Sequence, residues 1–399
     1  MPEAACDGRT SDAVPRVQVG DIARAFGAAL RGSCALSSEQ HAVLRAIERC
    51  RTAALGGHLH VCEHCGYSVP VYNSCRNRHC PTCQSLEQHR WLERRRERIL
   101  PAPYFHLVFT LPAELRPLVM AHREPLFTML FQAASETLLT LARDTKRLGA
   151  TPAITMVLHT WTRDLRFHPH VHAIVSAGGL RAGDPARWVR TRARYLFPVK
   201  VMAKLFRRLF RTALLHAIET GAVSVPSECA ATLDRALFDK RWVVYAKAPF
   251  SGAEQVFAYL GRYTHRVGIS NSRILRSDAD GVTFRTKNGA TCTLHPVEFL
   301  RRLLWHVLPK GFHKIRHYGL ASASHVRLGT LEHARSLLDP HKTAAQRTEA
   351  DHGDAPQTWV ECLLALTGVD ALRCPRCEIG RLMPQPLPAP VLPALRDTS

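Results

Sequence analysis

Residues 159–180, HTWTRDLRFHPHVHAIVSAGGL, determine how the rest of the chain is interpreted. Two apolar runs of β type meet here across the polar segment RDLRFHP. His170 and His172 are two residues apart, so on a strand they share one face. If the two strands pair antiparallel across a turn in the polar segment, His159 lies opposite them, with Cβ atoms about 5 Å away. Three imidazoles are therefore expected to converge.

Such a group of three ligands leaves coordination positions open on a divalent ion, as a catalytic metal site requires and a structural one does not. His168 has the same parity but precedes Pro169 at the mouth of the turn, and we give it less weight than the other three. Because the chain has 22 histidines, the alternative is a set of exposed or hydrogen-bonded side chains without a metal. The prediction is a site made of His159, His170 and His172.

The surrounding pattern of apolar residues predicts an α+β fold. Strands are expected at 104–112, at 241–249 and on both sides of the polar segment, and a hairpin over 269–295 turns at Asp280-Gly281 or Asn288-Gly289. Helices are expected over 117–148, 201–220 and 251–265. No glycine-rich dinucleotide fingerprint and no P-loop is present, so no nucleotide cofactor is expected.

Charge indicates the class of partner. The 399 residues include 54 Lys and Arg against 33 Asp and Glu, a net charge of +21, which points to a polyanion. Arginines occur along the whole chain without an isolated amphipathic basic helix, which favours nucleic acid over a lipid surface. No apolar run is long enough to span a membrane and the first residues lack the features of a secretion signal, so we expect a cytoplasmic protein without a membrane partner.

Cysteines indicate a structural zinc site. Two C-x2-C pairs 14 residues apart, Cys62/Cys65 and Cys80/Cys83, each place two thiolates on a tight turn and together could surround one ion. Further candidate ligands leave open a site with three cysteines and one histidine; they are Cys75, His60, His64 and His79. A separate pair, Cys374 and Cys377, supplies only half of a second site, and whether it binds metal stays open.

A basic helix is expected over 88–100, ending at Pro101 and Pro103. Its arginines either follow a phosphate backbone or form a solvated face; they are Arg94, Arg95, Arg96 and Arg98. The pattern divides the chain into four parts. These are a mobile leader over 1–35, a capped helix with the zinc ribbon and basic helix over 36–100, the α+β domain over 101–320, and a C-terminal tail with a Pro-rich end over 321–399.

The predicted helix over 251–265 contains two tyrosines at helical spacing. Tyr259 and Tyr263 are i and i+4 neighbours on one face, which Arg266 shares and Arg262 borders. Two tyrosines at this spacing are by themselves more often packing residues than catalytic ones. Only the predicted histidine site raises the hypothesis that they face a cleft.

Taken together, these motifs resemble the HUH-type transposases of rolling-circle insertion sequences, specifically the two-tyrosine insertion sequence 91 family. The resemblance extends from about residue 36 to the tail. It includes NSCRNRHCPTCQ in the ribbon, YFHLVFTLP, the histidine stretch quoted above, and AYLGRYTHRVGIS with both tyrosines.

The resemblance implies an HUH nuclease domain with a central antiparallel sheet flanked by helices, preceded by a small zinc-ribbon domain. It also implies Mg2+ or Mn2+ at the histidines, structural Zn2+ at the cysteines, and single-stranded DNA at element ends and in the target as substrate. Tyr259 and Tyr263 would be the nucleophiles that form 5′-phosphotyrosine intermediates. Arg262 and Arg266 would supply positive charge beside the attacking phenol.

Two alternatives use the same motifs. A replication initiator or relaxase of the HUH type would perform the same cleavage in another context. A zinc-ribbon DNA-binding regulator without catalysis would use the histidines and tyrosines only for structure. Covalent attachment to DNA would distinguish the regulator from the transposase and from the initiator or relaxase.

Overall fold

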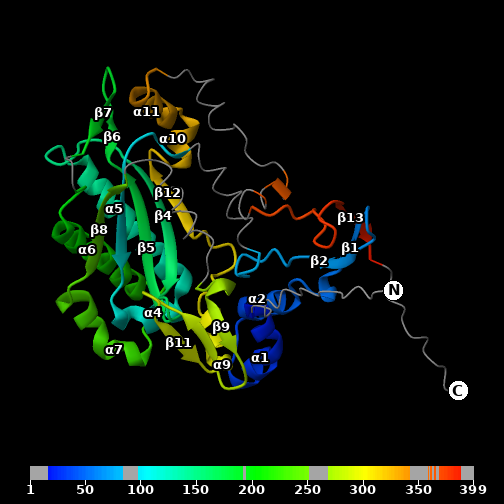
Figure 1. Cartoon of the computed structure of the whole chain (residues 1–399). Coiled ribbons are helices and arrows are strands. Elements are labelled where there is room, and N and C mark those ends of the chain that lie inside the picture. The colour runs from blue at the N-terminus through cyan, green and yellow to red at the C-terminus, as the bar shows by residue number, and fades with distance from the viewer. Residues whose placement is uncertain are drawn as a thin grey trace, which may run out of the picture.

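A five-stranded antiparallel sheet forms the centre of the molecule (Figure 1). The computed structural model describes residues 17–83, 98–191, 195–250, 268–341, 358, 360–361, 364 and 368–387. The strand order is β12-β4-β5-β3-β8. The strands are β3 (Tyr104–Thr110), β4 (Ala153–Trp161), β5 (Phe167–Ser176), β8 (Val243–Phe250) and β12 (Ile315–Gly319). The α+β class with a central antiparallel sheet is confirmed.

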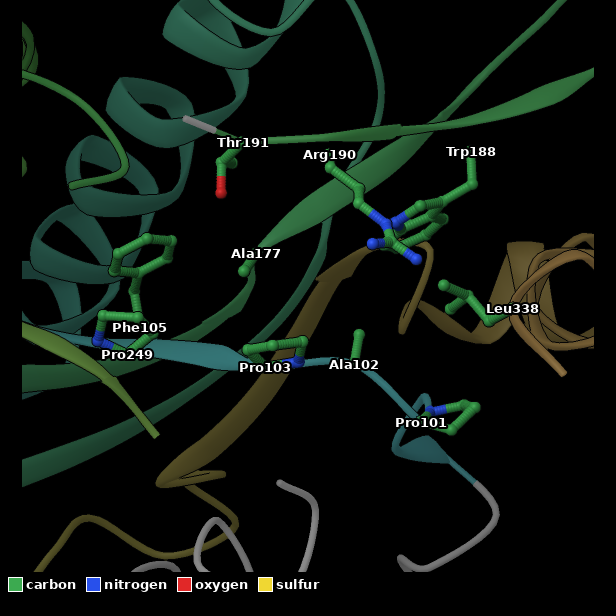
Figure 2. Close-up of a pocket in the computed structure, with 10 residues that line it drawn as sticks. All are labelled: Pro101, Ala102, Pro103, Phe105, Ala177, Trp188, Arg190, Thr191, Pro249 and Leu338. Atoms are coloured by element: carbon green, nitrogen blue, oxygen red, sulfur yellow. The ribbon is translucent and has the colours of Figure 1, made fainter. Parts of the chain in front are cut away.

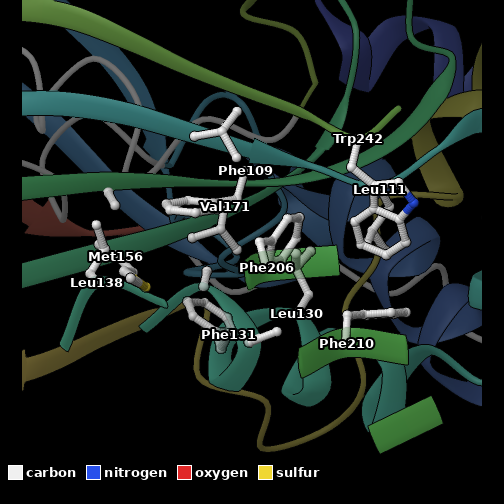
Figure 3. Close-up of a cluster of buried hydrophobic side chains, with 14 of the residues drawn as sticks. Phe109, Leu111, Leu130, Phe131, Leu138, Met156, Val171, Phe206, Phe210 and Trp242 are labelled. Atoms are coloured by element: carbon white, nitrogen blue, oxygen red, sulfur yellow. The ribbon is translucent and has the colours of Figure 1, made fainter. Parts of the chain in front are cut away.

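One face of this sheet is apolar and covered by helices. Alternate residues of β3, Phe105, Leu107 and Phe109, are buried at 0–1% exposure, as period-2 alternation requires. Against them pack α5 (Arg123–Arg143) and α6 (Val199–Glu219), whose Phe131 and Phe206 are fully buried (Figure 3). The opposite face is therefore the one that presents the histidines.

The predicted single helix over 117–148 is interrupted. The structure has α4 (Arg116–Ala121), a break at His122 with φ −125° and ψ 56°, and then α5. Pro125 has no amide hydrogen to donate to the carbonyl four residues earlier, so the first helix cannot continue through it. A new helix begins where the amide of Leu126 donates to the carbonyl of His122. The helix predicted over 201–220 is confirmed as α6.

The expected mobile leader is wrong for residues 19–33. They form α1 (Val19–Ser33), with Val19, Ile22 and Leu30 almost fully buried. This helix packs on α2 (Ser38–Arg49), which begins after its N-cap residue Ser37, and on α9 (Pro296–Leu304). Residues 1–16 lie outside the described part.

A second core joins the N-terminal helices to residues far along the chain. It contains residues of α1 and α2 together with β9 (Ile274–Ser277), β10 (Val282–Arg285) and α9. β9, β10 and β11 (Thr291–Leu294) form a meander that turns at both predicted dipeptides, with Asn288 and Gly289 at φ 54° and 78°. The predicted boundary at residue 100 therefore does not separate the N-terminal core from the rest.

The ribbon is a three-stranded sheet whose third strand comes from the other end of the chain. β1 (Gly57–Cys62) pairs with β2 (Ser68–Tyr72) on one side and with β13 (Leu382–Pro386) on the other. In Figure 1 this sheet lies on the side of the molecule away from α6 and α7 (Ser227–Asp234). Part of the expected tail is thus a strand of the ribbon.

The remaining elements complete the end of the sheet near the start of β3. They are the hairpin β6 (Gly178–Arg181) and β7 (Arg187–Arg190), and the helices α10 (Ala323–Arg327) and α11 (Thr330–Leu338). Within the described part of the chain, no helix has both the length and the apolar character needed to cross a membrane.

Candidate metal centres and catalytic face

The three histidines converge on the face of the central sheet opposite the apolar core. His159 of β4 pairs directly with His170 of β5, as the predicted register requires, and His172 follows two residues later on the same face. One ring nitrogen from each of the three lies within 4.8 Å of the others. The strand pairing predicted from the sequence is confirmed, and the side chains are close enough to share one ion.

A β-bulge adjoins this site. The register of β4 against β5 shifts by one residue between His159 and Trp161, so β5 carries an extra residue next to Pro169. Proline cannot donate to a sheet ladder and is tolerated inside a sheet at such irregularities. His168, in the same irregular stretch, accepts a hydrogen bond at Nδ1 from Arg116 (3.1 Å) and is not one of the three converging residues.

Hydrogen bonds orient two of the three rings. Nδ1 of His170 donates to the carbonyl oxygen of His168 at 2.7 Å, which leaves its Nε2 as the unprotonated nitrogen. Nδ1 of His172 lies 2.8 Å from Nε2 of His106, with the two rings nearly parallel. If His172 is to use Nε2 as a ligand, its Nδ1 must carry the proton and donate a hydrogen bond to Nε2 of His106.

Burial keeps these imidazoles neutral. Loss of solvation lowers the pKa of His106 to about 4 and that of His170 to about 4. The pKa of His172 is also lowered well below its ordinary value, first by burial and then by the neighbouring His159 and His170. Neutral histidine is the form that binds metal and, in His106, the form whose Nε2 can accept a hydrogen bond.

His106 was missed in the sequence analysis. It lies on β3, where it has the same parity as Val108 and Thr110, the residues paired with His172 and His170. The detectable signal was a histidine at an outward-facing position of a strand whose other face is apolar. To assign His106 to the site, one must also know that β3 and β5 are neighbouring strands.

The same face continues onto the edge strand β8. Val108 pairs with His172 on one side and with Tyr245 on the other, so these three residues form one row across the sheet. Tyr245 is 55% exposed and lies two strands, or about 10 Å, from His172 along that row. On the other side of the site, Trp161 stacks on His159 with centroids 4.6 Å apart. The histidines thus have an exposed tyrosine on one flank and an indole on the other.

Several predicted residues lie outside the described part of the chain. They are Tyr259, Arg262, Tyr263 and Arg266 of the tyrosine segment, and Arg94, Arg95 and Arg96 of the basic helix. Arg98 is described and is partly exposed just before Leu100, which is buried. The structure therefore places the histidines but not the tyrosines.

The predicted zinc site of Cys62, Cys65, Cys80 and Cys83 is not formed as one group. The structure divides these residues between two clusters of four thiols. The Cys50 cluster contains Cys50, Cys75, Cys80 and Cys83. The Cys62 cluster contains Cys62, Cys65, Cys374 and Cys377.

The geometry of the β1–β2 hairpin explains this division. Cys62 and Cys65 lie at its tip, whereas Cys50 precedes the start of β1 and Cys75 follows the end of β2. A strand of six residues separates the two ends by about 17 Å. The pair Cys80 and Cys83 joins the open end of the hairpin and cannot also reach the tip.

The Cys50 cluster has the dimensions of a tetrahedral thiolate site. Sγ of Cys83 lies 3.4 Å from that of Cys50 and 3.6 Å from that of Cys75, close to the roughly 3.8 Å edge that Zn–S bonds of about 2.3 Å produce. Hydrogen bonds from neighbouring thiols lower the pKa of Cys83 and bring that of Cys50 to about 7. Cys50, which is not among the ligands predicted from the sequence, thus belongs to a candidate metal site.

None of the three spare histidines of the ribbon joins either thiol cluster. His79 is instead a buried hydrogen-bond acceptor, because its Nε2 receives the amide of Leu308 at 3.2 Å. Burial lowers the pKa of His79 to about 3, which keeps it neutral for this role. His60 and His64 are likewise outside the two clusters, so both clusters have four sulfur ligands.

A cavity of about 260 Å³ lies at the other end of the sheet. Figure 2 shows Trp188 and Arg190 of β7 close together at one wall, with Pro103 and Ala177 below them. It adjoins the first residues of β3, whereas His170 pairs with Thr110 at the last. The cavity is therefore separated from the histidines by most of the length of β3.

Comparison with known proteins identifies related sequences. Residues 153–327 match a family model described as "Putative transposase", and residues 22–111 match one described as "Transposase zinc-binding domain". The first range contains the three histidines and the second contains the whole Cys50 cluster, which supports structural zinc there. No solved structure matches significantly.

Two curated relatives cover most of the chain. The "Putative transposase y4qJ" of Sinorhizobium fredii is 41% identical over 92% of this chain and 94% of its own. The "Transposase for insertion sequence element IS801" of Pseudomonas savastanoi is 30% identical over 68% of this chain and 67% of its own. On this evidence, and on the zinc-binding module and histidine face described above, the chain belongs to the insertion sequence 91 family of transposases, enzymes that act on DNA.

Proposed function

We propose that this transposase cleaves and rejoins single-stranded DNA through a tyrosine nucleophile during rolling-circle transposition. The observation that carries the proposal is the convergence of His159, His170 and His172 on the face of the sheet opposite the core. Three ring nitrogens within 4.8 Å of one another are better explained by a shared ligand.

The donor set fits a divalent metal ion. Hydrogen bonds occupy Nδ1 of His170 and Nδ1 of His172, so Nε2 of each would be the ligand atom. Within the described residues no carboxylate belongs to the group, so imidazole nitrogens would make up the protein ligands. Nitrogen ligands favour Mn2+ over the harder Mg2+. When bound, the ion would act as a Lewis acid on a phosphate oxygen.

The residues of the chain supply the remaining chemistry. The hydroxyl of Tyr259 or Tyr263 attacks the scissile phosphorus, loses its proton and forms a bond to the 5′-phosphate. The bond from phosphorus to the 3′ oxygen breaks, and that oxygen takes up a proton to leave a free 3′-hydroxyl. Arg262 and Arg266 would stabilise the added negative charge. Because the phosphodiester is conserved in the tyrosine ester, rejoining by a 3′-hydroxyl needs no nucleotide cofactor.

Two tyrosines allow two DNA ends to be held at once, one from the donor and one from the second cleavage. The net charge of +21 supports binding of the DNA backbone. We assign part of that binding to the predicted helix that contains Arg94, Arg95, Arg96 and Arg98. Single-stranded DNA at the element ends and in the target is the proposed substrate.

The transposase relatives favour this function over a replication initiator or relaxase, because one of them is named for an insertion sequence. A regulator without catalysis would have no use for three histidines whose ring nitrogens lie within 4.8 Å of one another. The zinc-binding module agrees with all three functions and does not separate them.

The test is incubation of the full chain with labelled single-stranded element ends and Mn2+, followed by denaturing electrophoresis. We expect an adduct that survives SDS, requires the divalent ion, and is absent with the same sequence as a duplex. The variant His170→Ala should form no adduct. The matched control His333→Ala changes an exposed histidine of α11 and should behave as the unmodified chain. An adduct formed in excess EDTA, or by His170→Ala at the normal rate, would disprove the proposal.

A further inference from the structure

The Cys62 cluster joins two parts of the chain that are more than 300 residues apart. Cys62 and Cys65 lie at the tip of the β1–β2 hairpin, and Cys374 and Cys377 lie shortly before β13. The sequence shows each pair clearly, but only the fold shows that the second pair completes the first. The matched zinc-binding domain ends at residue 111 and contains only one of the two pairs.

The distances between sulfur atoms match those of a tetrahedral ion. Sγ of Cys62 lies 3.7 Å from that of Cys377, and Sγ of Cys65 lies 3.7 Å from that of Cys374. An ion with Zn–S bonds of about 2.3 Å has sulfur atoms about 3.8 Å apart. A disulfide requires about 2.05 Å between two sulfur atoms and would use them in pairs, leaving no reason for all four to converge.

The backbone around the cluster is shaped for sulfur ligands. The amide of Gly380 donates to Sγ of Cys377 at 3.4 Å, and the amide of Gly66 closes the turn after Cys62 by donating to its carbonyl. Gly66 has φ 68°, a conformation that favours glycine. A Cβ on Gly380 would lie 2.6 Å from Sγ of Cys62, so this position must also be glycine.

The strand pairing brings the two pairs into register. Residues of β1 and β13 pair antiparallel from His58 with Pro386 to Cys62 with Leu382. One residue beyond the ladder, the amide of Glu63 donates to the carbonyl of Arg381 at 3.1 Å. β13 thereby positions the loop that carries Cys374 and Cys377 against the hairpin tip.

Hydrophobic burial alone does not account for this attachment. Among the residues that the structure describes, the local cluster has three buried members, Cys62, Cys374 and Leu382, with Tyr67 and the other two cysteines partly buried around them. Protein modules with so small a core are normally stabilised by a metal ion or by disulfides. Two of the three buried residues here are themselves thiols.

We propose that Cys62, Cys65, Cys374 and Cys377 bind a second structural zinc ion that fastens the C-terminal segment to the N-terminal zinc-binding module. The ion has four protein ligands and no open position, so it takes no part in the cleavage. Its role is to hold β13 as the third strand of the ribbon. The chain then contains two zinc ions at independent sites, with the ligand pair Cys62/Cys65 in a different site from Cys80/Cys83.

Elemental analysis of the full chain, purified without chelators, tests the proposal. We expect two zinc ions per chain. The double variant Cys374→Ser/Cys377→Ser should retain only the zinc ion of the Cys50 cluster. The double variant Cys75→Ser/Cys83→Ser should retain only that of the Cys62 cluster. The control Cys292→Ser changes a partly buried cysteine outside both clusters and should retain two.

Hydrogen exchange supplies a second measurement that does not depend on the number of ions. Amides of β13 should lose protection in Cys374→Ser/Cys377→Ser, whereas those of β4 and β5 should not. A wild-type chain with a single zinc ion would overturn the proposal whether or not the variants fold. Retention of two ions by Cys374→Ser/Cys377→Ser, or a Cys62–Cys377 disulfide found by mass spectrometry, would also overturn it.

Discussion

Replacing His106 by phenylalanine tests how the proposed catalytic metal site is held in shape. Nε2 of His106 lies 2.8 Å from Nδ1 of His172, and this contact would leave Nε2 of His172 as the nitrogen that binds an ion. Phenylalanine fills a similar volume but cannot accept the hydrogen bond from His172. The substitution therefore leaves the Nδ1–H group of His172 without its partner in a site that is largely shielded from water.

The size of the effect follows from that lost partner. An unpaired buried donor costs about 1–3 kcal/mol, which is about 5- to 150-fold in affinity at 1.36 kcal/mol for each factor of ten. Loss of a group that orients a metal-bound histidine typically costs about 10- to 100-fold. We therefore expect the His106→Phe variant to bind Mn2+ about 10- to 100-fold more weakly.

Calorimetric titration of the full chain with Mn2+ near pH 7.5 measures this change. At that pH His106 is neutral, because burial lowers its pKa to about 4. The matched variant His106→Gln retains an acceptor oxygen near the position of Nε2 and should recover most of the affinity. An unchanged dissociation constant in His106→Phe, or an equal loss in both variants, would refute the assigned role of His106.

Three further predictions follow from the same structure. The variant Cys80→Ser should lose one bound zinc ion and melt at a lower temperature, because Cys80 is 1% exposed in the core shared by α1, α2 and α9. His306 is buried and its pKa is lowered from 6.5 to about 3. Between pH 6.5 and about 3 this histidine is therefore protonated in the unfolded chain but neutral in the folded one, and the free energy of unfolding falls as the pH decreases through this range. Chemical denaturation of His306→Gln should show a pH slope smaller by about 1.4 kcal/mol per pH unit than that of the unmodified chain. The variant Tyr245→Phe should form the DNA adduct at the normal yield, and loss of that adduct would instead make Tyr245 the nucleophile.

The histidine register was predictable because it depends on local chemistry. Alternation with period 2 sets the faces of β4 and β5, and the polar segment between them permits only a short connection. Once the strands pair in sequence order, His159 must lie near His170. The role of His106 depends instead on β3 being the neighbour of β5 on the other side, which no local pattern specifies.

The grouping of the cysteines was not predictable from their spacing. Four thiols at C-x2-C spacing could share one ion if the chain between them folded back directly. The intervening hairpin instead carries Cys62 about 17 Å from the open end where Cys50 and Cys75 lie. The other two ligands of the Cys62 cluster come from the loop before β13. Strand pairing between the two ends of a chain leaves no recognisable pattern in the sequence of either segment.

Helix α1 was missed for a different reason. Its sequence, VGDIARAFGAALRGS, contains three glycines, which lower helix propensity. The helix is stabilised by tertiary packing, because Val19, Ile22 and Leu30 are buried against α2 and α9. Gly27 leaves room for the carboxylate of Glu48 of α2, which would have to move if a Cβ were present.

Mapping the DNA attachment site by mass spectrometry tests the proposed function most directly. Trypsin separates the candidate tyrosines, because Tyr259 lies in the peptide 248–262, Tyr263 in 263–266 and Tyr245 in 242–247. We predict a nucleotide on the first or second peptide, formed only with a divalent ion and absent from the Tyr259→Phe/Tyr263→Phe variant. A nucleotide on the peptide 242–247 or on any other residue, or an adduct formed by that double variant, would contradict the account.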